Sequence, residues 1–559
     1  MSIGTVYIHN DYSECEFLSD DNSDIIKIYG KNNIGKCFSG DIVKLHNEQL
    51  QLVKSNIQDK ILVGILELYS SYKYGSTKKG IERFKFTPLQ KEYPCFLVSS
   101  KCKSKYTSNV IVTIKYLEWE STLPYGEIIQ YLGDIYNQQA IFESVLYKNN
   151  LVLPKYNLHK IQKQFKELTT ENLPDLCKNM NNIINEHIIS IDPPGTKDID
   201  DCFHFKKKGV NHYLVGIHIS NVIDMIHYLR IPFLLETTLI SSVYAPHRIV
   251  NMFPNILSEN YLSLANKKIR LAVTLWIDIK NNHILNSSFE RTIIQNKHNY
   301  SYDEYEKFLS KNKEHYDFFS CIQNLNYKNL TYSNFDTHTF IEKLMCIYNC
   351  EVSEYLDSAN KKLVFRSQEP SCNFQSIKTD DELNSFLNII QNNSAIYTFS
   401  KQSHHSLQLD KYTHATSPIR RYVDIYNQHL LFNNLELPIN LEEINQYTQN
   451  IKKADRLFQK IKFQYILNEG NHKHLVYIYQ CEDNKISIYL PEYKLSIRLR
   501  LIEKKIEHLY TIKKNVSTSE IIIINNQVNN VSTLKMFNKL NCEIYCINNS
   551  IYPKFKIIF

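Results

Sequence analysis

The sequence predicts a multidomain α+β protein in which small β modules flank a central domain of mixed helices and strands. Three observations support this prediction. The 559 residues correspond to about three to five domains at about 100–200 residues each. Short β-rich runs separated by polar turns occupy both ends of the chain, and strands and helices mix between about residues 190 and 465. A composition of 43% hydrophobic and 22% charged residues excludes wholesale disorder.

Two β modules are predicted at the N-terminal end, over residues 1–58 and 59–152. The first contains the runs GTVYIHN, DIIKIYG and DIVKLHN, and the second contains ILVGILELY, YPCFLVSS and NVIVTIKYLEW. Because the chain has only 13 glycines, we expect that geometry requires Gly126 and Gly133 in the segment LPYGEIIQYLG. Barrels of the OB type are the simplest interpretation, and strand patterning alone leaves other small β folds open.

A mixed α/β domain is predicted over residues 153–467, followed by a third β module over residues 468–559. The central domain begins with a helical lead-in from about residue 155 to 190. It continues with strands such as YLVGIHIS and LAVTLWIDI and with the helix FIEKLMCIYNCEVSEYL. Residues 445–467 have the spacing of a basic amphipathic helix. The C-terminal runs KISIYLPEY, KLSIRLRLI and SEIIIINNQV return to strand patterns and favour another barrel.

Charge and cysteine content restrict the functional classes only in part. The net charge of +7 permits a polyanionic partner without demonstrating one. The 13 cysteines are an odd number without a CxxC pair, which favours reduced, buried thiols in an intracellular protein. The N-terminal residues lack a signal-peptide pattern, and no apolar run approaches the ~18 residues of a membrane span. We therefore expect a cytoplasmic protein that does not contact membranes.

The segment SIDPPGTKDIDDCFHF carries four aspartates: Asp192, Asp198, Asp200 and Asp201. The Pro-Pro-Gly turn bends the chain so that Asp192 can face the later three. Clustered carboxylates raise one another's pKa unless a cation neutralises them. Hard oxygen ligands in this number suit Mg²⁺ or Mn²⁺, and paired Mg²⁺ ions can clamp the attacking and leaving oxygens of a phosphodiester. A solvated acidic turn is the alternative, whereas a calcium loop is disfavoured because its glycine and closing glutamate are absent.

The segment YTHATSPIRRYVD predicts a helix start that carries two arginines. Ser417 suits the N-cap position and Pro418 the first helical position. Arg420 and Arg421 would then lie near the helix N-terminus, where the dipole favours anions and an arginine can hold a phosphate. The alternative is a solvated arginine pair without function.

Together these two segments resemble the signature motifs of the ribonuclease II (RNB) family of exoribonucleases. The four aspartates have the family's spacing, and TSPIRRY resembles its arginine motif. Further segments resemble family segments in the same order: GIHISNV, VYAPHRIVNMFPNILSENYLSL, IRLAVT, YSYDEY and THTFIEKLMCIYN. Collinear matches of this number are not credibly a product of chance.

The resemblance implies an architecture of two cold-shock OB barrels, a central α/β RNB catalytic domain and a C-terminal S1-type OB barrel. The pattern around Trp119 and Pro124 is closer to the eukaryotic exosome-associated branch. The N-terminal endonuclease domain of that branch is not expected, because the sequence begins at the first barrel.

The implied activity is Mg²⁺-dependent, hydrolytic 3′→5′ exoribonucleolysis of single-stranded RNA to nucleoside 5′-monophosphates by a monomer, with Mn²⁺ as another permitted ion. A catalytically weak RNA-binding protein that retains the fold is the main alternative. An unrelated two-metal nuclease is a third interpretation, which the collinear segments disfavour.

The resemblance also assigns roles to individual residues. The four aspartates would hold one or two Mg²⁺ and position the attacking water, and loss of Asp200 should affect the chemical step most. Arg420 would stabilise charge on the scissile phosphate. Tyr244 would stack on a base near the 3′ end, while Tyr302 and Glu342 would contact the terminal nucleotides, where 2′-OH contacts favour RNA over DNA. For each of these last three a purely structural role is the alternative.

Three positions depart from the family pattern. Asn221 stands where the family usually has an acid, Asn251 replaces an expected proline, and Gln428 replaces an expected histidine. We expect these departures to affect the rate and the end-product length more than the existence of activity. The second stacking aromatic of the family's base clamp has no match in the sequence.

Overall fold

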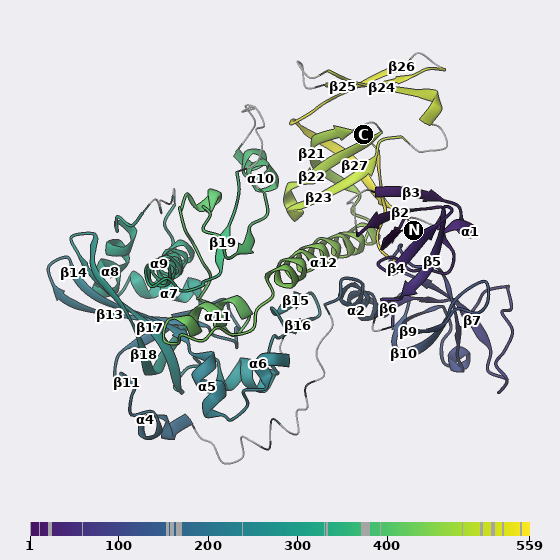
Figure 1. Cartoon of the computed structure of the whole chain (residues 1–559). Coiled ribbons are helices and arrows are strands. Elements are labelled where there is room, and N and C mark those ends of the chain that lie inside the picture. Colours follow the sequence, from purple (N-terminus) through teal and green to yellow (C-terminus); the bar gives the residue numbers. More distant parts are fainter. Residues whose placement is uncertain are drawn as a thin grey trace. The chain divides into compact units, whose positions relative to one another are not determined.

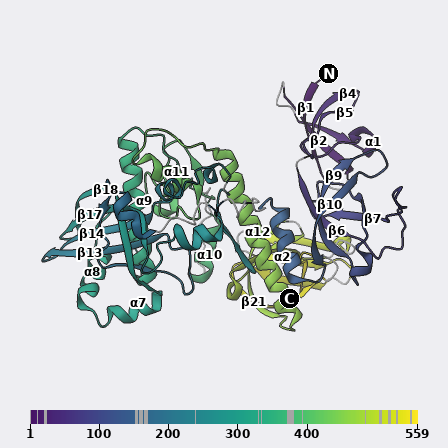
Figure 2. The ribbon, with the colours of Figure 1, turned by 90° about the horizontal axis from the view of Figure 1, so that it is seen from below.

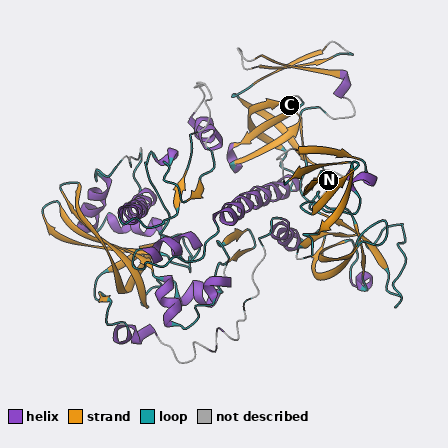
Figure 3. Cartoon of the chain, in the orientation of Figure 1, coloured by secondary structure: helices purple, strands orange, loops and turns teal. Residues whose placement is uncertain are grey.

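The computed structural model divides the chain into two compact units. The first comprises Met1–Val152, Ala245–Arg248 and Asn450–Phe559, and the second comprises Leu153–Tyr244 and Ile249–Gln449. The structure describes all residues except 1, 10, 11, 21–24, 59, 152–155, 157–160, 162, 164–169, 238, 329, 331, 333, 371–380, 392, 483, 503–506, 516–519, 528, 529, 548–550 and 559. Strands dominate the first unit, whereas helices and strands mix in the second (Figures 1 and 3).

The first unit contains three five-stranded β modules with one common strand order. In each, the first three strands form a meander and the fourth pairs with the first. The first module runs β3-β2-β1-β4-β5, with strands at Ser2–Ile8, Glu14–Ser19, Ile25–Tyr29, Ile42–His46 and Gln49–Lys54 for β1 to β5. The second is a closed barrel, β10-β8-β7-β6-β9, with strands at Ile61–Leu66, Arg83–Pro88, Phe96–Ser99, Val110–Glu118 and Tyr125–Asp134 for β6 to β10. This order is that of an OB barrel.

The third module has the same strand order at the C-terminal end. It runs β23-β22-β21-β27-β28, with strands at Lys473–Glu482, Lys485–Leu490, Leu495–Arg500, Lys539–Cys546 and Phe555–Ile558 for β21, β22, β23, β27 and β28. Between β23 and β27, the strands β24 (Tyr510–Asn515), β25 (Glu520–Asn525) and β26 (Asn530–Lys535) form a separate three-stranded sheet. The predicted boundaries at residues 58, 152 and 467 stay predictions.

The second unit is built on a six-stranded sheet in the order β11-β18-β12-β13-β14-β17. Strand β18 is long enough to pair with β17 through its first part and with β12 through its last part. The strands are β11 (Asn181–Asn182), β12 (Ile188–Ile191), β13 (Asp201–Gly209), β14 (His212–Ser220), β17 (Ile269–Lys280) and β18 (His283–Tyr300). Figures 1 and 2 show β13, β14 and β17 side by side.

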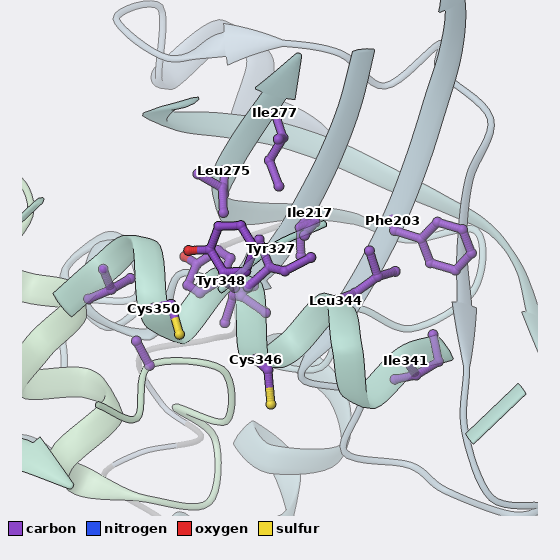
Figure 4. Packing of buried hydrophobic residues seen from close by; sticks show 14 of the residues in the cluster. Phe203, Ile217, Leu275, Ile277, Tyr327, Ile341, Leu344, Cys346, Tyr348 and Cys350 are labelled. Carbon is purple, nitrogen blue, oxygen red and sulfur yellow. The ribbon is translucent and has the colours of Figure 1, made fainter. Parts of the chain in front are cut away.

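One face of this sheet packs against the predicted central helix, which is α9 (Thr337–Ser358). Asp336 caps α9, because its carboxylate accepts a hydrogen bond from Thr339 N at 2.8 Å. Strand residues that alternate in sequence point to this face, and Figure 4 shows Ile217 and Leu275 beside Tyr348 of α9. Each fully buried side chain of this size contributes about 1.5–3 kcal/mol, so this core holds the strand ends in fixed positions.

Further helices and strands belong to the described part of the chain. The helices are α1 (Lys31–Ile34), α2 (Gln138–Lys148), α4 (Leu173–Leu176), α5 (Val222–Tyr228), α6 (Leu234–Thr237), α7 (Tyr302–Leu309), α8 (Lys313–Gln323), α10 (Asp381–Gln391), α11 (Tyr422–Leu430) and α12 (Leu441–Asn468). The strands are β15 (Val243–Ala245), β16 (Arg248–Val250), β19 (Phe365–Ser367) and β20 (Ile396–Thr398).

Two helical expectations have different outcomes. The predicted amphipathic helix at 445–467 is confirmed as α12. Much of the helical lead-in lies outside the described residues, and its second half is wrong, because a turn and β11 follow α4. Asn181 and Asn182 pair with Thr292 and Ile293 of β18, so sheet pairing overrides the helical spacing there. Among the described residues, no helix is both long and apolar enough to cross a membrane.

Candidate functional site

The first aspartate of the cluster lies directly after strand β12. The backbone N–H of Asp192 donates to the carbonyl of Tyr300 at 2.9 Å, so Asp192 continues the pairing of β12 with β18. A turn follows, in which Thr196 N–H and Thr196 Oγ1 both donate to the carbonyl of Pro193. Gly195 has a φ of +83° in this turn, a conformation that glycine adopts without strain. The Pro-Pro-Gly turn therefore returns the chain towards β12, as predicted.

Asp200 and Asp201 lie where the returning chain enters β13. Ser220 N–H donates to the carbonyl of Asp200 at 2.9 Å, and Asp201 pairs with Ile219 of β14. The turn itself is tied down by Ser263, whose Oγ accepts from Ile199 N–H at 3.0 Å and donates to Lys197 O at 2.6 Å. The sheet and this hydroxyl together fix the carboxylates at the edge of the core.

The arginine motif meets the aspartate cluster at Asp200. Its carboxylate accepts from the backbone N–H of Ile419 at 2.9 Å and from Arg420 Nε at 3.2 Å. Asp200 is buried, whereas the Arg420 side chain is 41% exposed. Arg420 Nη2 also donates to Ser417 Oγ at 2.9 Å. The guanidinium is therefore held on one side by the protein and is accessible on the other.

The neighbouring arginine has a different environment. Arg421 Nε and Nη2 donate to the two carboxylate oxygens of Asp424 at 2.9 and 2.8 Å, and Asp424 is fully buried. The same carboxylate accepts from Ser417 N–H at 2.8 Å. Arg421 therefore stabilises the fold of the motif, and the interpretation of both arginines as a solvated pair is wrong.

The predicted helix start at Ser417 and Pro418 is also wrong. These residues form a turn, and α11 begins only at Tyr422. The reason is a short β bridge, because Arg421 is extended and pairs with Ser241. Ser242 N–H donates to Arg420 O at 3.0 Å. This bridge fixes the backbone of Arg420 before the helix starts.

Burial and mutual repulsion shift the pKa values of three aspartates. Burial raises the pKa of Asp192 to about 6, with a further contribution from Asp198 and an opposing one from Arg420. Burial raises the pKa of Asp200 to about 7, although Arg420 and the Ile419 N–H oppose the shift. The pKa of Asp201 is well above its usual range, because of burial and the nearby carboxylates of Asp192 and Asp200.

These carboxylates fit a hard divalent cation in their chemistry. Asp192 Oδ2 is buried without a hydrogen-bond partner among the described residues, and the repulsion between Asp192 and Asp201 would be relieved by a bound cation. However, within the described part of the chain no group of three or more His, Cys, Asp or Glu side chains is arranged to hold a metal ion. The donor set is thus suitable, but its members are not gathered around one point.

Asp198 lies beside the first predicted aromatic contact. Tyr244 in β15 is 47% exposed, and its hydroxyl donates to Asp198 Oδ2 over a long distance of 3.4 Å. Burial and the carboxylates of Asp198 and Asp200 raise the pKa of the Tyr244 phenol to about 12, although Arg420 opposes the shift. The hydroxyl therefore stays protonated, and the core-tyrosine alternative for Tyr244 is disfavoured.

Tyr302 also lies close to the aspartate cluster, at the first position of α7. Burial raises the pKa of Tyr302, and the carboxylates of Asp201 and Asp192 contribute to this shift. The ring of Tyr302 stacks on the imidazole of His338, with 3.7 Å between the ring centroids and 18° between the planes. Ser301 holds this end of α7 in a capping box with Glu304.

His338 is a site residue that the sequence did not indicate. It is exposed at the start of α9, one helical turn before Glu342 and on the same side of the helix. Glu342 is exposed too, and burial together with Asp336 raises its pKa. The structure gives Glu342 no hydrogen bond or ion pair with the aspartate cluster among the described residues. Its position inside the segment THTFIEKLMCIYN was the only available signal for His338.

Two departures from the family pattern line one small cavity. Asn221 caps α5, with its Oδ1 accepting from Asp224 N–H and its Nδ2 donating to Asp224 Oδ2 at 2.6 Å. Gln428 of α11 lines the same cavity, as does Arg291, which forms an ion pair with Asp224. Gln428 Nε2 is buried without a partner among the described residues. Asn251 lies elsewhere and donates to Asn255 Oδ1.

Family models match both the second unit and the second barrel. The RNB domain matches residues 180–326 and 320–436, a span that includes every predicted site residue. The chain contains an RNB domain. A Dis3-like cold-shock domain 2 matches residues 83–150, which confirms the cold-shock prediction for the second β module. The predicted fold class is confirmed: the chain has cold-shock OB, RNB and C-terminal β parts.

Relatives from both bacterial and eukaryotic members of the RNB family resemble the chain. Ribonuclease R of Chlamydia pneumoniae is 24% identical over 426 residues, which cover 63% of this chain and 62% of the relative. Exosome complex exonuclease RRP44 of Mus musculus is 24% identical over 481 residues, which cover 70% of this chain and 50% of the relative. The chain thus spans less than two thirds of the length of either protein.

Solved structures show the same RNB fold. Mycoplasma genitalium RNase R in complex with ribose-methylated single-stranded RNA superimposes with a TM-score of 0.72 at 17% identity, covering 97% of each chain. Yeast Ssd1, described as a pseudonuclease, gives a TM-score of 0.68 at 14% identity, covering 100% of this chain and 96% of Ssd1. At these identities the likeness concerns the fold alone.

Proposed function

We propose that the protein is a Mg²⁺-dependent, hydrolytic 3′→5′ exoribonuclease that degrades single-stranded RNA to nucleoside 5′-monophosphates. The observation that carries this proposal is the pairing of Arg420 with the buried carboxylate of Asp200, beside the carboxylates of Asp192 and Asp201, within an RNB domain. This arrangement offers a positioned arginine for the charge on the phosphate and a set of hard oxygen ligands for a metal ion, the two parts that metal-assisted phosphodiester hydrolysis uses.

The chain's own residues have separable roles in this proposal. Asp192, Asp198, Asp200 and Asp201 would hold Mg²⁺ or Mn²⁺, which when bound would neutralise them and polarise the phosphate. Asp200 orients Arg420 through the Nε hydrogen bond at 3.2 Å. The free side of the Arg420 guanidinium then binds the scissile phosphate, and this contact strengthens as charge develops there.

Three further side chains would position the RNA. Tyr244 is sufficiently exposed for stacking, and stacking on a base contributes about 1–3 kcal/mol. Tyr302, backed by the His338 ring, would contact the terminal nucleotide beside the aspartates. Glu342 would accept a hydrogen bond from the ribose 2′-OH, which DNA lacks. The RNA-bound structure of a protein with the same fold supports RNA as the substrate class.

The alternative is an RNA-binding protein that retains the RNB fold without efficient hydrolysis. The similarity to yeast Ssd1, a pseudonuclease, favours this alternative. The retained carboxylates weigh against it, because burying mutually repelling charges destabilises a fold that gains nothing from them.

A degradation assay separates the two candidates. A 5′-labelled single-stranded RNA, and a DNA of the same sequence, are incubated with the full chain in Mg²⁺ or in excess EDTA. Shortening of RNA from the 3′ end, with DNA spared and no reaction in EDTA, is the expected result. Tight RNA binding without shortening in Mg²⁺ or Mn²⁺ would favour the alternative, and endonucleolytic fragments would contradict both. Glu443→Gln, in α12, is a control variant that should degrade RNA like the parent, because Glu443 lines a separate cavity.

A further inference from the structure

A large cavity of about 1170 Å³ lies in the first unit, apart from the candidate functional site. We call it the intermodule pocket, because its lining comes from the first β module and from the β7–β8 and β9–β10 loops of the second. Its volume exceeds the about 300–1,000 Å³ that is typical of small-ligand sites. The lining residues used below are three aromatics and three lysines: Tyr12, Tyr93, Trp119, Lys31, Lys36 and Lys91.

The aromatic part of the intermodule pocket is held rigidly. Trp119 packs on Phe38 with 4.9 Å between the ring centroids and meets the edge of Tyr12 at 6.1 Å. Tyr12 is buried and its hydroxyl donates to Cys37 O at 2.9 Å. Lys60 Nζ donates to the hydroxyl of Tyr93 at 3.3 Å. Rings fixed in this way offer a flat apolar surface that needs no rearrangement before a ligand stacks on it.

One polar group in the lining lacks a partner. The indole Nε1 of Trp119 is buried and has no hydrogen-bond acceptor among the described residues. A buried N–H without an acceptor destabilises the protein, and such groups are rare in native structures. Because this nitrogen has no accessible surface, a ligand in the pocket contacts the ring of Trp119 and not its N–H.

The charged side chains that line the intermodule pocket are all positive. The described lining contains three lysines and neither Asp nor Glu. Lys36 Nζ donates to the backbone carbonyl of Glu120 at 2.9 Å, which leaves its charge uncompensated. Lys31 and Lys91 are exposed and form no ion pair within the described part of the chain. The buried carboxylate of nearby Asp41 is occupied by other donors, including Phe38 N–H at 2.8 Å. The pocket therefore favours an anion.

We propose that the intermodule pocket binds a nucleotide. The base stacks on the aromatic surface, and the phosphate lies near Lys31 and Lys91. Stacking and phosphate contacts of this kind are independent of base sequence. The ligand is either a free nucleotide or one unit of a single-stranded RNA. This site goes beyond the proposed function, because it uses none of the aspartates and requires no hydrolysis.

The tryptophan content of the chain allows a direct test. The chain has two tryptophans, and Trp276 lies in β17 of the second unit, where its Nε1 donates to Glu290 at 2.8 Å. In the full-length Trp276→Phe variant, Trp119 is the one remaining indole fluorophore. Adding AMP should quench its emission saturably. Adenosine lacks the phosphate and ribose 5-phosphate lacks the base, so each should bind at least about tenfold more weakly than AMP. Trp119→Phe, which leaves Trp276, should show no saturable quenching.

A charge-matched pair of variants completes the test. In the Trp276→Phe background, Lys31→Ala with Lys91→Ala should weaken AMP binding about tenfold and reduce its salt dependence. Lys54→Ala with Lys73→Ala removes two exposed lysines outside the pocket and should change neither. A single-stranded oligoribonucleotide, added in an Asp200→Asn background, distinguishes the sources: quenching by the oligomer alone indicates a unit of RNA, and quenching by both indicates free nucleotide as well.

Two results would overturn the proposal. One is the absence of saturable quenching of Trp119 by either AMP or the oligomer. The other is equal affinity in the Lys31/Lys91 and Lys54/Lys73 variants. Neither result depends on RNA degradation, so failure of this proposal and failure of the proposed exoribonuclease activity are distinguishable.

Discussion

Arg420 Nε lies 3.2 Å from Asp200 Oδ2, which joins a half-exposed cation to a buried carboxylate across 220 positions of the sequence. The Ile419 N–H donates to the other oxygen of the same carboxylate at 2.9 Å. Asp200 therefore fixes both the backbone and the side chain of the arginine motif. This relationship makes the two most specific sequence motifs parts of one site.

The two adjacent arginines should give opposite phenotypes when each is replaced by alanine. Arg421→Ala leaves the buried Asp424 carboxylate without its bidentate partner, so it should destabilise the second unit by about 3–5 kcal/mol. Arg420→Ala removes a half-exposed group and leaves Asp200 its hydrogen bond from the Ile419 N–H. It should therefore lower the urea midpoint much less than Arg421→Ala, while RNA hydrolysis falls at least about 100-fold. Urea unfolding and single-turnover kinetics of both variants check this. Equal loss of stability in the two variants would contradict the division of roles.

His338 should act by positioning Tyr302. His338→Ala removes the ring that stacks on Tyr302 at 3.7 Å and should raise KM for RNA about threefold to tenfold with a smaller change in kcat. His338→Phe keeps a stacking ring and should restore KM. Because His338 is exposed, neither variant should shift the thermal midpoint. A KM that is equally raised in the alanine and phenylalanine variants would show that the stack does not matter.

The buried histidine pair predicts a loss of stability in acid. His204 Nδ1 and His218 Nε2 are 2.8 Å apart on neighbouring strands. Burial lowers the pKa of His204 to about 4 and lowers that of His218 well below its usual range. Both rings are therefore neutral in the folded state near neutral pH, whereas in the unfolded chain they take up protons below about pH 6.5. Stability is fully present above pH 6.5 and is lost as the pH falls towards 4, by about 3 kcal/mol for His204.

The measurement for this pair uses urea unfolding from pH 7.5 to 4.5, followed by the emission of Trp276, whose ring lies edge-on to His204 at 5.4 Å. Trp119→Phe removes the other indole. His204→Asn, which cannot titrate in this range, should flatten the decline. The same slope in parent and variant would mean that other groups cause the acid sensitivity.

Asn221 and Gln428 should behave as a coupled pair. Asn221→Asp replaces a donor that lies 2.6 Å from Asp224 Oδ2 with a second carboxylate, and should destabilise the protein by about 1–3 kcal/mol. Adding Gln428→His supplies a group that can be protonated in the same cavity and should recover part of the loss. A double-mutant cycle by urea unfolding should give a coupling of about 1 kcal/mol, and strict additivity would contradict the coupling.

The sequence predicted correctly those elements whose structure depends on residues close together in the chain. Helix α9 has a cap and an apolar face of regular spacing, and the four aspartates are close in sequence, so both could be predicted. The helix start at Ser417 and the helical lead-in were wrong because partners distant in sequence decide them. Ser241 extends Arg421 by bridging it, and β18 extends Asn181 and Asn182 by pairing with them.

Prediction of the site residues was limited in the same way, because contacts distant in sequence could not be predicted. Spacing and resemblance indicated the aspartates and Arg420, but they could not separate Arg420 from Arg421, because that difference depends on the buried position of Asp424. His338 gave no signal of its own, since its partner Tyr302 lies 36 positions earlier. The intermodule pocket likewise combines residues from two modules, and none of its lysines forms a motif.

The most direct test of the central claim is single-turnover degradation of a 5′-labelled single-stranded RNA by Asp200→Asn and by the parent, with RNA affinity measured in parallel. Asparagine is close in shape and keeps one acceptor oxygen, which can replace one of the two oxygens that accept from Ile419 and Arg420, but it removes the charge. We predict that hydrolysis falls at least about 100-fold in Mg²⁺ while the Kd for RNA changes less than about threefold and the fold is retained. Undiminished shortening of the RNA by Asp200→Asn would contradict the assignment of the aspartate cluster and Arg420 as the hydrolytic site.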